Sequence, residues 1–179
     1  METPKITFIE RTNSDKRKEK IIHPFDGRAS PLDIGELEST IAGLVRMVDL
    51  TDFDYVLGFS EAGIIPAYAF ARLSKKPLVC SYRTRTNLPN EIRFLEPHLR
   101  LPEHFIYALR KGDSVVIIDD EITSANTIVS AVMSLEETGV SVRAVGSIIC
   151  RQLPEENELF FRTRGIPLYY LHKVDKPTK

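Results

Sequence analysis

Two adjacent carboxylates followed by hydroxyl side chains form the pattern with the clearest chemical meaning in this sequence. Asp119 and Asp120 follow an apolar run, and Thr123, Ser124 and Thr127 come within the next seven positions. Neighbouring carboxylates suit the vicinal hydroxyls of a sugar or the water ligands of Mg²⁺. Hydroxyl donors at a helix start, where backbone N–H groups are unpaired, suit a phosphate monoester. Together these groups predict a ribose 5-phosphate ligand.

The elements that must position these residues alternate between strand and helix. Helical periodicity predicts helices over 33–50, 64–73 and 127–137. Apolar and β-branched runs predict strands over 54–59, 78–80, 114–118, 140–150 and 168–171. This alternation indicates an α/β fold with a doubly wound, mainly parallel sheet flanked by helices. Ligands of such sheets bind at the carboxyl ends of strands, where the acidic pair is expected.

Length and composition limit the classes of protein to consider. The 179 residues suit one domain spanning 1–179, and a net charge of -1 argues against a general nucleic-acid or membrane-surface binder. No apolar stretch is long enough for a membrane span, and the N-terminus has no signal-like apolar segment, so a cytoplasmic location is expected. Cys80 and Cys150 follow apolar runs and are expected to be buried free thiols.

The segment 81–111 has a different character from the rest of the chain. Prolines interrupt it at positions 89, 97 and 102, and it contains five arginines and two histidines, His98 and His104. An insertion of this length between core elements is usually functional or disordered.

The run 115–127, VVIIDDEITSANT, resembles the phosphoribosyl-pyrophosphate (PRPP) signature of type I phosphoribosyltransferases. The resemblance implies the fold of that family, with a small N-/C-terminal hood that includes residues 1–32. It implies that Asp119 and Asp120 are catalytic and hold the ribose hydroxyls and Mg²⁺, directly or through water. The 5-phosphate would be bound by the loop Thr123, Ser124, Ala125, Asn126 and Thr127.

The turn after the predicted strand 54–59 resembles the pyrophosphate loop of the same family. It consists of Ser60, Glu61, Ala62 and Gly63. Small residues there let backbone amides approach a diphosphate. An arginine found in the adenine enzymes of the family is missing from this turn, so Arg83 and Arg85 are the candidates to contact the diphosphate and act in catalysis. In the family, this basic segment leads into a mobile loop that closes over the reacting centre, which corresponds to 81–111 here.

Two departures from the family pattern concern the acceptor. Ala125-Asn126 stands where the family usually has glycine, and Thr123 stands where hypoxanthine–guanine enzymes carry a carboxylate. A hydroxyl is a poor base near pH 7, which favours adenine over a 6-oxopurine. Phe25 and His98 are candidates for contacting the base.

The resulting prediction is a Mg²⁺-dependent, homodimeric transferase of purine salvage that moves the phosphoribosyl group of PRPP to a base and releases pyrophosphate. Three alternatives stay open: a PRPP-binding regulator without transferase activity, a transferase for an orotate-like pyrimidine or an unusual base, and an acidic helix cap without a ligand. A phosphoacceptor receiver domain is disfavoured, because neither the N-terminal acidic pair nor the lysine after a late strand that such domains carry is evident.

Overall fold

A five-stranded parallel sheet forms the centre of the molecule. The computed structural model describes residues 4–10, 19–28, 30–97 and 102–174. The strands of the sheet are β3 (Tyr55–Gly58), β4 (Leu78–Cys80), β7 (Ser114–Ile122), β8 (Ser141–Arg151) and β9 (Leu168–Val174). They are arranged in the order β4-β3-β7-β8-β9, and every neighbouring pair is parallel. The predicted doubly wound α/β architecture is therefore confirmed.

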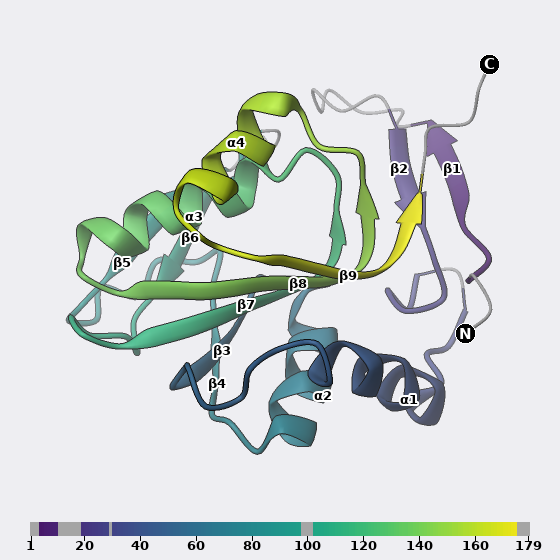
Figure 1. The fold of residues 1–179 in the computed structure, drawn as a ribbon, viewed down its shortest axis with the longest axis horizontal. Helices are drawn as coiled ribbons and strands as arrows, with labels where there is room; N and C mark the ends of the chain where they lie inside the picture. The colour runs from purple at the N-terminus through teal and green to yellow at the C-terminus, as the bar shows by residue number, and fades with distance from the viewer. Residues whose placement is uncertain (1–3, 11–18, 29, 98–101, 175–179) are drawn as a thin grey trace.

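Helices cover both faces of this sheet. The helices α1 (Ile34–Val45) and α2 (Ile64–Ser74) lie on one face, and α3 (Asn126–Glu137) and α4 (Glu155–Thr163) lie on the other (Figure 1). Asp33 caps α1 by accepting a hydrogen bond from the Glu36 amide at 2.9 Å. The sequence pattern did not predict α4, because only Asn157 and Phe161 of that helix are buried and the rest reads as a polar segment.

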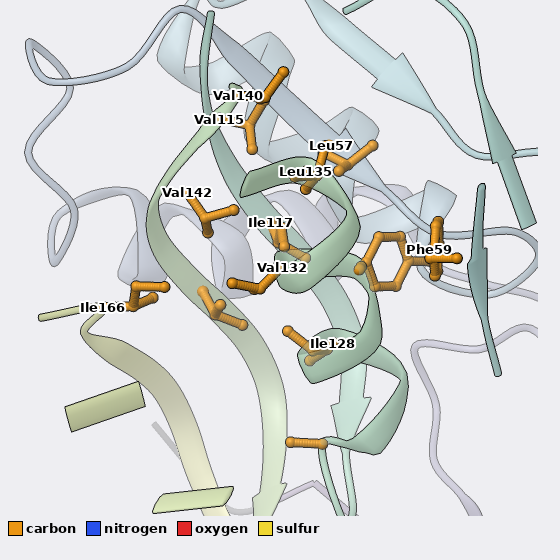
Figure 2. Packing of buried hydrophobic residues seen from close by; sticks show 14 of the residues in the cluster. Leu57, Phe59, Val115, Ile117, Ile128, Val132, Leu135, Val140, Val142 and Ile166 are labelled. Atoms are coloured by element: carbon orange, nitrogen blue, oxygen red, sulfur yellow. The ribbon is translucent and has the colours of Figure 1, made fainter. Parts of the chain in front are cut away.

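The central strand β7 packs against both helical layers. Val115 and Ile117 belong to the core under α3 and α4, whereas Val116 and Ile118 belong to the core under α1 and α2, and all four are fully buried. Figure 2 shows the first core, where α3 packs its apolar side against β3, β7 and β8. Burial on both faces explains why this strand is a continuous apolar run in the sequence.

The strand order changes direction at β3, and open α/β sheets commonly have a crevice at such a point. From β3, the chain adds β4 on one side and then crosses to add β7, β8 and β9 on the other side. Helices that follow β3 and β7 consequently lie on opposite faces, and their connecting loops separate at the carboxyl ends of these two strands. Open α/β sheets bind ligands at such a switch point. The turn Ser60–Gly63 follows β3, and Asp119 and Asp120 lie at the end of β7, so both predicted binding segments lie at this switch point.

Two antiparallel hairpins flank the sheet. One joins β1 (Thr7–Glu10) to β2 (Glu19–Ile22), within the predicted hood. The other joins β5 (Ile92–Leu95) to β6 (Glu103–Ile106), within the segment predicted as a mobile loop. No strand was predicted in either place, because an alternation of apolar and polar residues over only four positions, between charged or proline-rich turns, is too short to be recognised. The mobility of 81–111 and the hood role of 1–32 stay predictions.

Candidate functional site

The acidic pair lies inside the second half of β7 rather than after the strand. The strand was predicted to end at Ile118, but its pairing with β8 continues through Ile122. Backbone hydrogen bonding to β8 therefore holds both carboxylates on a rigid element. The Asp119 Oδ1 atom also accepts a hydrogen bond from the Asp120 amide at 3.1 Å, which fixes the first side chain further.

Gly63 brings the first turn against the acidic pair. A Cβ atom added at Gly63 would lie 2.3 Å from Oδ1 of Asp119 and 2.9 Å from the carbonyl oxygen of Phe59. Only glycine fits between these two groups. The missing side chain at position 63 therefore lets the turn after β3 contact the carboxylate at the end of β7, which joins the two predicted binding segments into one site.

The two carboxylates have opposite electrostatic environments. Burial and the negative charge of Asp120 raise the pKa of Asp119 well above its usual range. Burial by itself would also raise the pKa of Asp120, but the polar contact with the His23 ring, whose Nε2 atom lies beside this carboxylate, outweighs it and holds that pKa below its usual value. The pKa of Asp119 is thus raised and that of Asp120 lowered, so Asp120 is the more acidic carboxyl of the pair.

His23 is a site residue that the sequence did not identify. Its Nε2 atom lies 3.4 Å from Oδ2 of Asp120, and its Nδ1 atom accepts a hydrogen bond from the Phe25 amide at 3.3 Å. An accepting Nδ1 leaves the proton on Nε2, where it faces the carboxylate. His23 is 2% exposed. The only signal in the sequence was a histidine within the predicted hood, far from the acidic pair along the chain.

The predicted phosphate loop opens α3 without a side-chain cap. Ala125, the residue before the helix, has a left-handed backbone (φ 62°) and no hydroxyl or carboxylate to accept the first amides of α3. These amides and the positive end of the helix dipole are what a phosphate requires. The Nδ2 atom of Asn157 in α4 donates to the Ser124 carbonyl and to Oδ1 of Asn126, both at 2.6 Å. The loop shape is therefore held from α4, although glycine is absent at 125 and 126.

The two predicted diphosphate arginines contact carboxylates of the β5–β6 segment. Arg83 pairs with Glu96, and Arg85 pairs with Glu91 at 2.9 Å. The Arg83 side chain is 29% exposed and the Arg85 side chain 61% exposed. Arg83 is thus held near the core, whereas Arg85 lies on the surface. Their contact with a diphosphate stays a prediction.

The two candidate base-binding residues differ in what can be said of them. Phe25 packs in the core under α1 and α2 and is 3% exposed, so its ring offers no open face for stacking in this conformation. His98 lies outside the described residues.

The acidic pair is a small ligand set for a metal ion. No group of three or more His, Cys, Asp or Glu residues with the arrangement of a metal site occurs within the described ranges. Two carboxylates are compatible with a hydrated Mg²⁺ that is bound together with an anionic substrate, because Mg²⁺ commonly keeps several waters and binds through one or two carboxylates plus phosphates. Both cysteines are free thiols, as predicted, but only Cys150 is buried, whereas Cys80 is half-buried because it lies at the end of the edge strand β4.

Within the described parts of the chain, no helix has both the length and the apolar character needed to cross a membrane.

Comparison with known proteins agrees with this geometry. A family model described as phosphoribosyl transferase matches residues 7–159. A hypoxanthine/guanine phosphoribosyltransferase from Methanospirillum hungatei is 27% identical over 134 residues, which cover 74% of each chain. One of the same name from Methanosarcina acetivorans is 30% identical over 138 residues, covering 73% of this chain and 69% of the relative. The solved adenine phosphoribosyltransferase from Leishmania donovani has a TM-score of 0.71 at 18% identity, covering 94% of this chain and 76% of that chain.

Proposed function

The chain belongs to the phosphoribosyltransferase family, and we propose that it transfers the 5-phosphoribosyl group of PRPP to a purine base and releases pyrophosphate. The observation that carries this proposal is the contact between Gly63 and Asp119 at the switch point of the sheet. It joins a turn suited to a diphosphate, an acidic pair suited to ribose hydroxyls and an uncapped helix start suited to a 5-phosphate. PRPP carries these three groups in one molecule.

The proposed mechanism assigns each part of the donor to one element. The amides at the start of α3 and the hydroxyls of Thr123 and Thr127 bind the 5-phosphate. Asp120, kept anionic by His23, accepts a hydrogen bond from a ribose hydroxyl and stabilises the positive charge that develops on the ribose ring. Mg²⁺ bound with the donor would offset the charge of the leaving diphosphate.

Asp119 is suited to a second role in the same step. It lies beside the turn Ser60–Gly63 and next to Asp120. It can therefore bind a second ribose hydroxyl or a water ligand of Mg²⁺ next to the diphosphate. The turn Ser60–Gly63 binds the diphosphate through its backbone, with Arg83 as the less exposed of the two candidate cations.

Two purines are candidates for the acceptor base, and a different observation supports each. Thr123 has no carboxylate to remove a proton from a 6-oxopurine, which supports adenine as the first candidate. The sequence relatives are named hypoxanthine/guanine enzymes, which supports a 6-oxopurine as the second.

A panel experiment tests the function and the acceptor together. The protein is incubated with PRPP, Mg²⁺ and adenine, hypoxanthine, guanine or orotate, and pyrophosphate release is followed. We expect release with adenine, and the ratio of kcat/KM values identifies the purine. Donor binding without release for any base would contradict the enzyme function and leave a PRPP-binding regulator. Release with orotate alone would contradict the purine assignment.

Single carboxamide variants test the site. Asp119→Asn and Asp120→Asn should each raise the Kd for PRPP at least tenfold, because each removes a charge that faces the ribose or its cation. Thermal unfolding of both variants separates loss of the site from loss of the fold. PRPP binding that is unchanged in both variants would contradict the assignment of the acidic pair.

Homodimerisation and a cytoplasmic location complete the proposal and rest on resemblance to the family. Light scattering coupled to size-exclusion chromatography tests the first, and a mass of 20.3 kDa, that of one chain, would contradict it.

A further inference from the structure

A chain of hydrogen bonds runs from the turn after β3 to the β5–β6 hairpin. The Ser60 amide donates to Oγ of Ser81 at 3.1 Å, and this hydroxyl lies 3.0 Å from Nδ1 of His104 in β6. The Nε2 atom of His104 lies 3.1 Å from Oε2 of Glu96, which also accepts from Arg83. Three side chains, those of Ser81, His104 and Glu96, thus connect the backbone of Ser60 to the guanidinium of Arg83.

The donors and acceptors of this hydrogen-bond network can all be matched if the protons are donated in the direction from Ser60 to Glu96. Because Ser81 Oγ already accepts from an amide, its hydroxyl proton can be donated to Nδ1 of His104. The other ring nitrogen then carries the proton and donates it to Glu96. Burial alone would raise the pKa of Glu96, but the His104 hydrogen bond and the Arg83 charge lower it to about 2. Glu96 is therefore an anion that accepts from both neighbours.

Burial and stacking hold the middle of the chain rigid. Ser81 and His104 are both 0% exposed, and the His104 ring stacks on Phe94 with centroids 4.7 Å apart and planes 13° apart. A serine, a histidine and a carboxylate in this order also describe a nucleophile triad. Complete burial of Ser81 excludes that function here, since no substrate reaches its hydroxyl in this conformation. The network consequently positions the groups at its two ends and does not react with a substrate.

The two ends of this hydrogen-bond network are the two groups expected to contact the diphosphate. Ser60 begins the turn Ser60–Gly63, and Arg83 is the candidate cation that the network reaches. We propose that His104 and Ser81 are positioning residues that set the spacing between this turn and Arg83, and so determine how tightly the diphosphate is bound. This inference rests on the proposed function. It goes beyond it by assigning a role to buried residues that touch no part of the donor.

Two variants remove hydrogen bonds from the network without creating a large cavity in the core. His104→Phe keeps an aromatic ring against Phe94 but has no ring nitrogens, and Ser81→Ala removes only the hydroxyl. Binding is measured by calorimetry with two probes, pyrophosphate with Mg²⁺ and ribose 5-phosphate. For both variants we expect the Kd for pyrophosphate to rise about tenfold and the Kd for ribose 5-phosphate to change less than twofold. A general loosening of the fold would raise both values together.

Arg93→Ala is the matched control, because it breaks an exposed ion pair with Glu103 on the same hairpin and has no link to the turn. It should leave both Kd values unchanged. The inference is overturned if the wild type binds pyrophosphate and both variants bind it equally well, or if the two probes weaken in parallel. If His104→Phe fails to fold, Ser81→Ala decides alone. A wild-type protein that binds neither pyrophosphate nor PRPP would instead contradict the proposed function, and this inference with it.

Discussion

At the scale of single residues, Gly63 has the strictest steric requirement in the site. In Gly63→Ala the new methyl group would overlap the Asp119 carboxylate and the Phe59 carbonyl, and a backbone carbonyl cannot rotate away. We expect a loss of about 1–3 kcal/mol in the free energy of unfolding and a Kd for PRPP raised at least tenfold. Urea denaturation and calorimetry measure the two effects.

Gly35→Ala provides the comparison for this substitution. Its new Cβ would meet only the flexible Asp33 side chain, at 3.3 Å in the first turn of α1. It should bind PRPP as the wild type does. If Gly63→Ala also retained wild-type binding, the contact between the turn and the acidic pair would have no functional importance.

Glu96 should make stability depend on pH. Its pKa in the folded state is about 2, below the 4.5 of a free glutamate, so its stabilising contribution is complete above pH 4.5 and is lost as the pH falls towards 2. Because its side chain is 19% exposed, we expect Glu96→Gln to lose about 2 kcal/mol at pH 7. The difference from wild type should shrink below pH 4.5.

Urea unfolding at pH 7, 5 and 3 measures this difference. Glu103→Gln breaks the exposed pair with Arg93 on the same hairpin, and it should change the free energy of unfolding by less than about 1 kcal/mol at any of these values. A Glu96→Gln difference that stays constant from pH 7 to pH 3 would contradict the assigned pKa.

At the scale of elements, α4 supports the phosphate loop from outside the sheet. Asn157 is the buried side chain that donates to Ser124 and Asn126. Asn157→Ala leaves that carbonyl and that amide oxygen without this donor, so the loop should lose its shape. We expect the Kd for ribose 5-phosphate to rise about tenfold and the Kd for pyrophosphate to stay within twofold, the opposite of the His104→Phe result.

The exposed residue Leu159 on the same helix gives the control variant, Leu159→Ala, which should leave both Kd values unchanged. Equal binding of ribose 5-phosphate by Asn157→Ala and wild type would mean that α4 does not support the loop.

Helices and strands were predicted well from the sequence where burial of one face imposes a regular spacing of apolar residues. The strand Leu78–Cys80 was placed correctly, and α2 and α3 were placed to within one residue at each end. The helix α4 was missed because a helix that covers a sheet edge with two buried residues has no clear apolar stripe. The hairpin β5–β6 was missed because its strands have four residues each.

The site could be predicted only as far as its residues are contiguous in sequence. Asp119 to Thr127 and Ser60 to Gly63 are local patterns, so their types and spacing indicated the ligand. His23 and Asn157 reach these loops from elements more than 25 positions away. Their roles depend on tertiary packing, which no local pattern encodes. The same holds for His104, which is recognisable only by its burial and its two partners.

At the scale of the whole molecule, charge explains why donor and cation should bind together. The chain has a net charge of -1, and the carboxylates of the acidic pair face the position proposed for a polyanionic donor. Without a cation, PRPP would meet anionic groups at this site and bind weakly. Without PRPP, two carboxylates offer Mg²⁺ too few ligands for tight binding, and no larger ligand cluster occurs in the described residues.

Thermal unfolding in four conditions tests this coupling. Mg²⁺ alone and PRPP with EDTA should each change Tm by less than about 2 °C. PRPP with Mg²⁺, at about one hundred times its Kd, should stabilise the fold by about 2.7 kcal/mol, which raises Tm by roughly 5–10 °C for a chain of this size. Equal shifts with and without EDTA would contradict a cation-dependent donor site. A large shift with Mg²⁺ alone would indicate a resident metal centre, because a cation that needs the donor oxygens as ligands cannot stabilise the fold before the donor is bound.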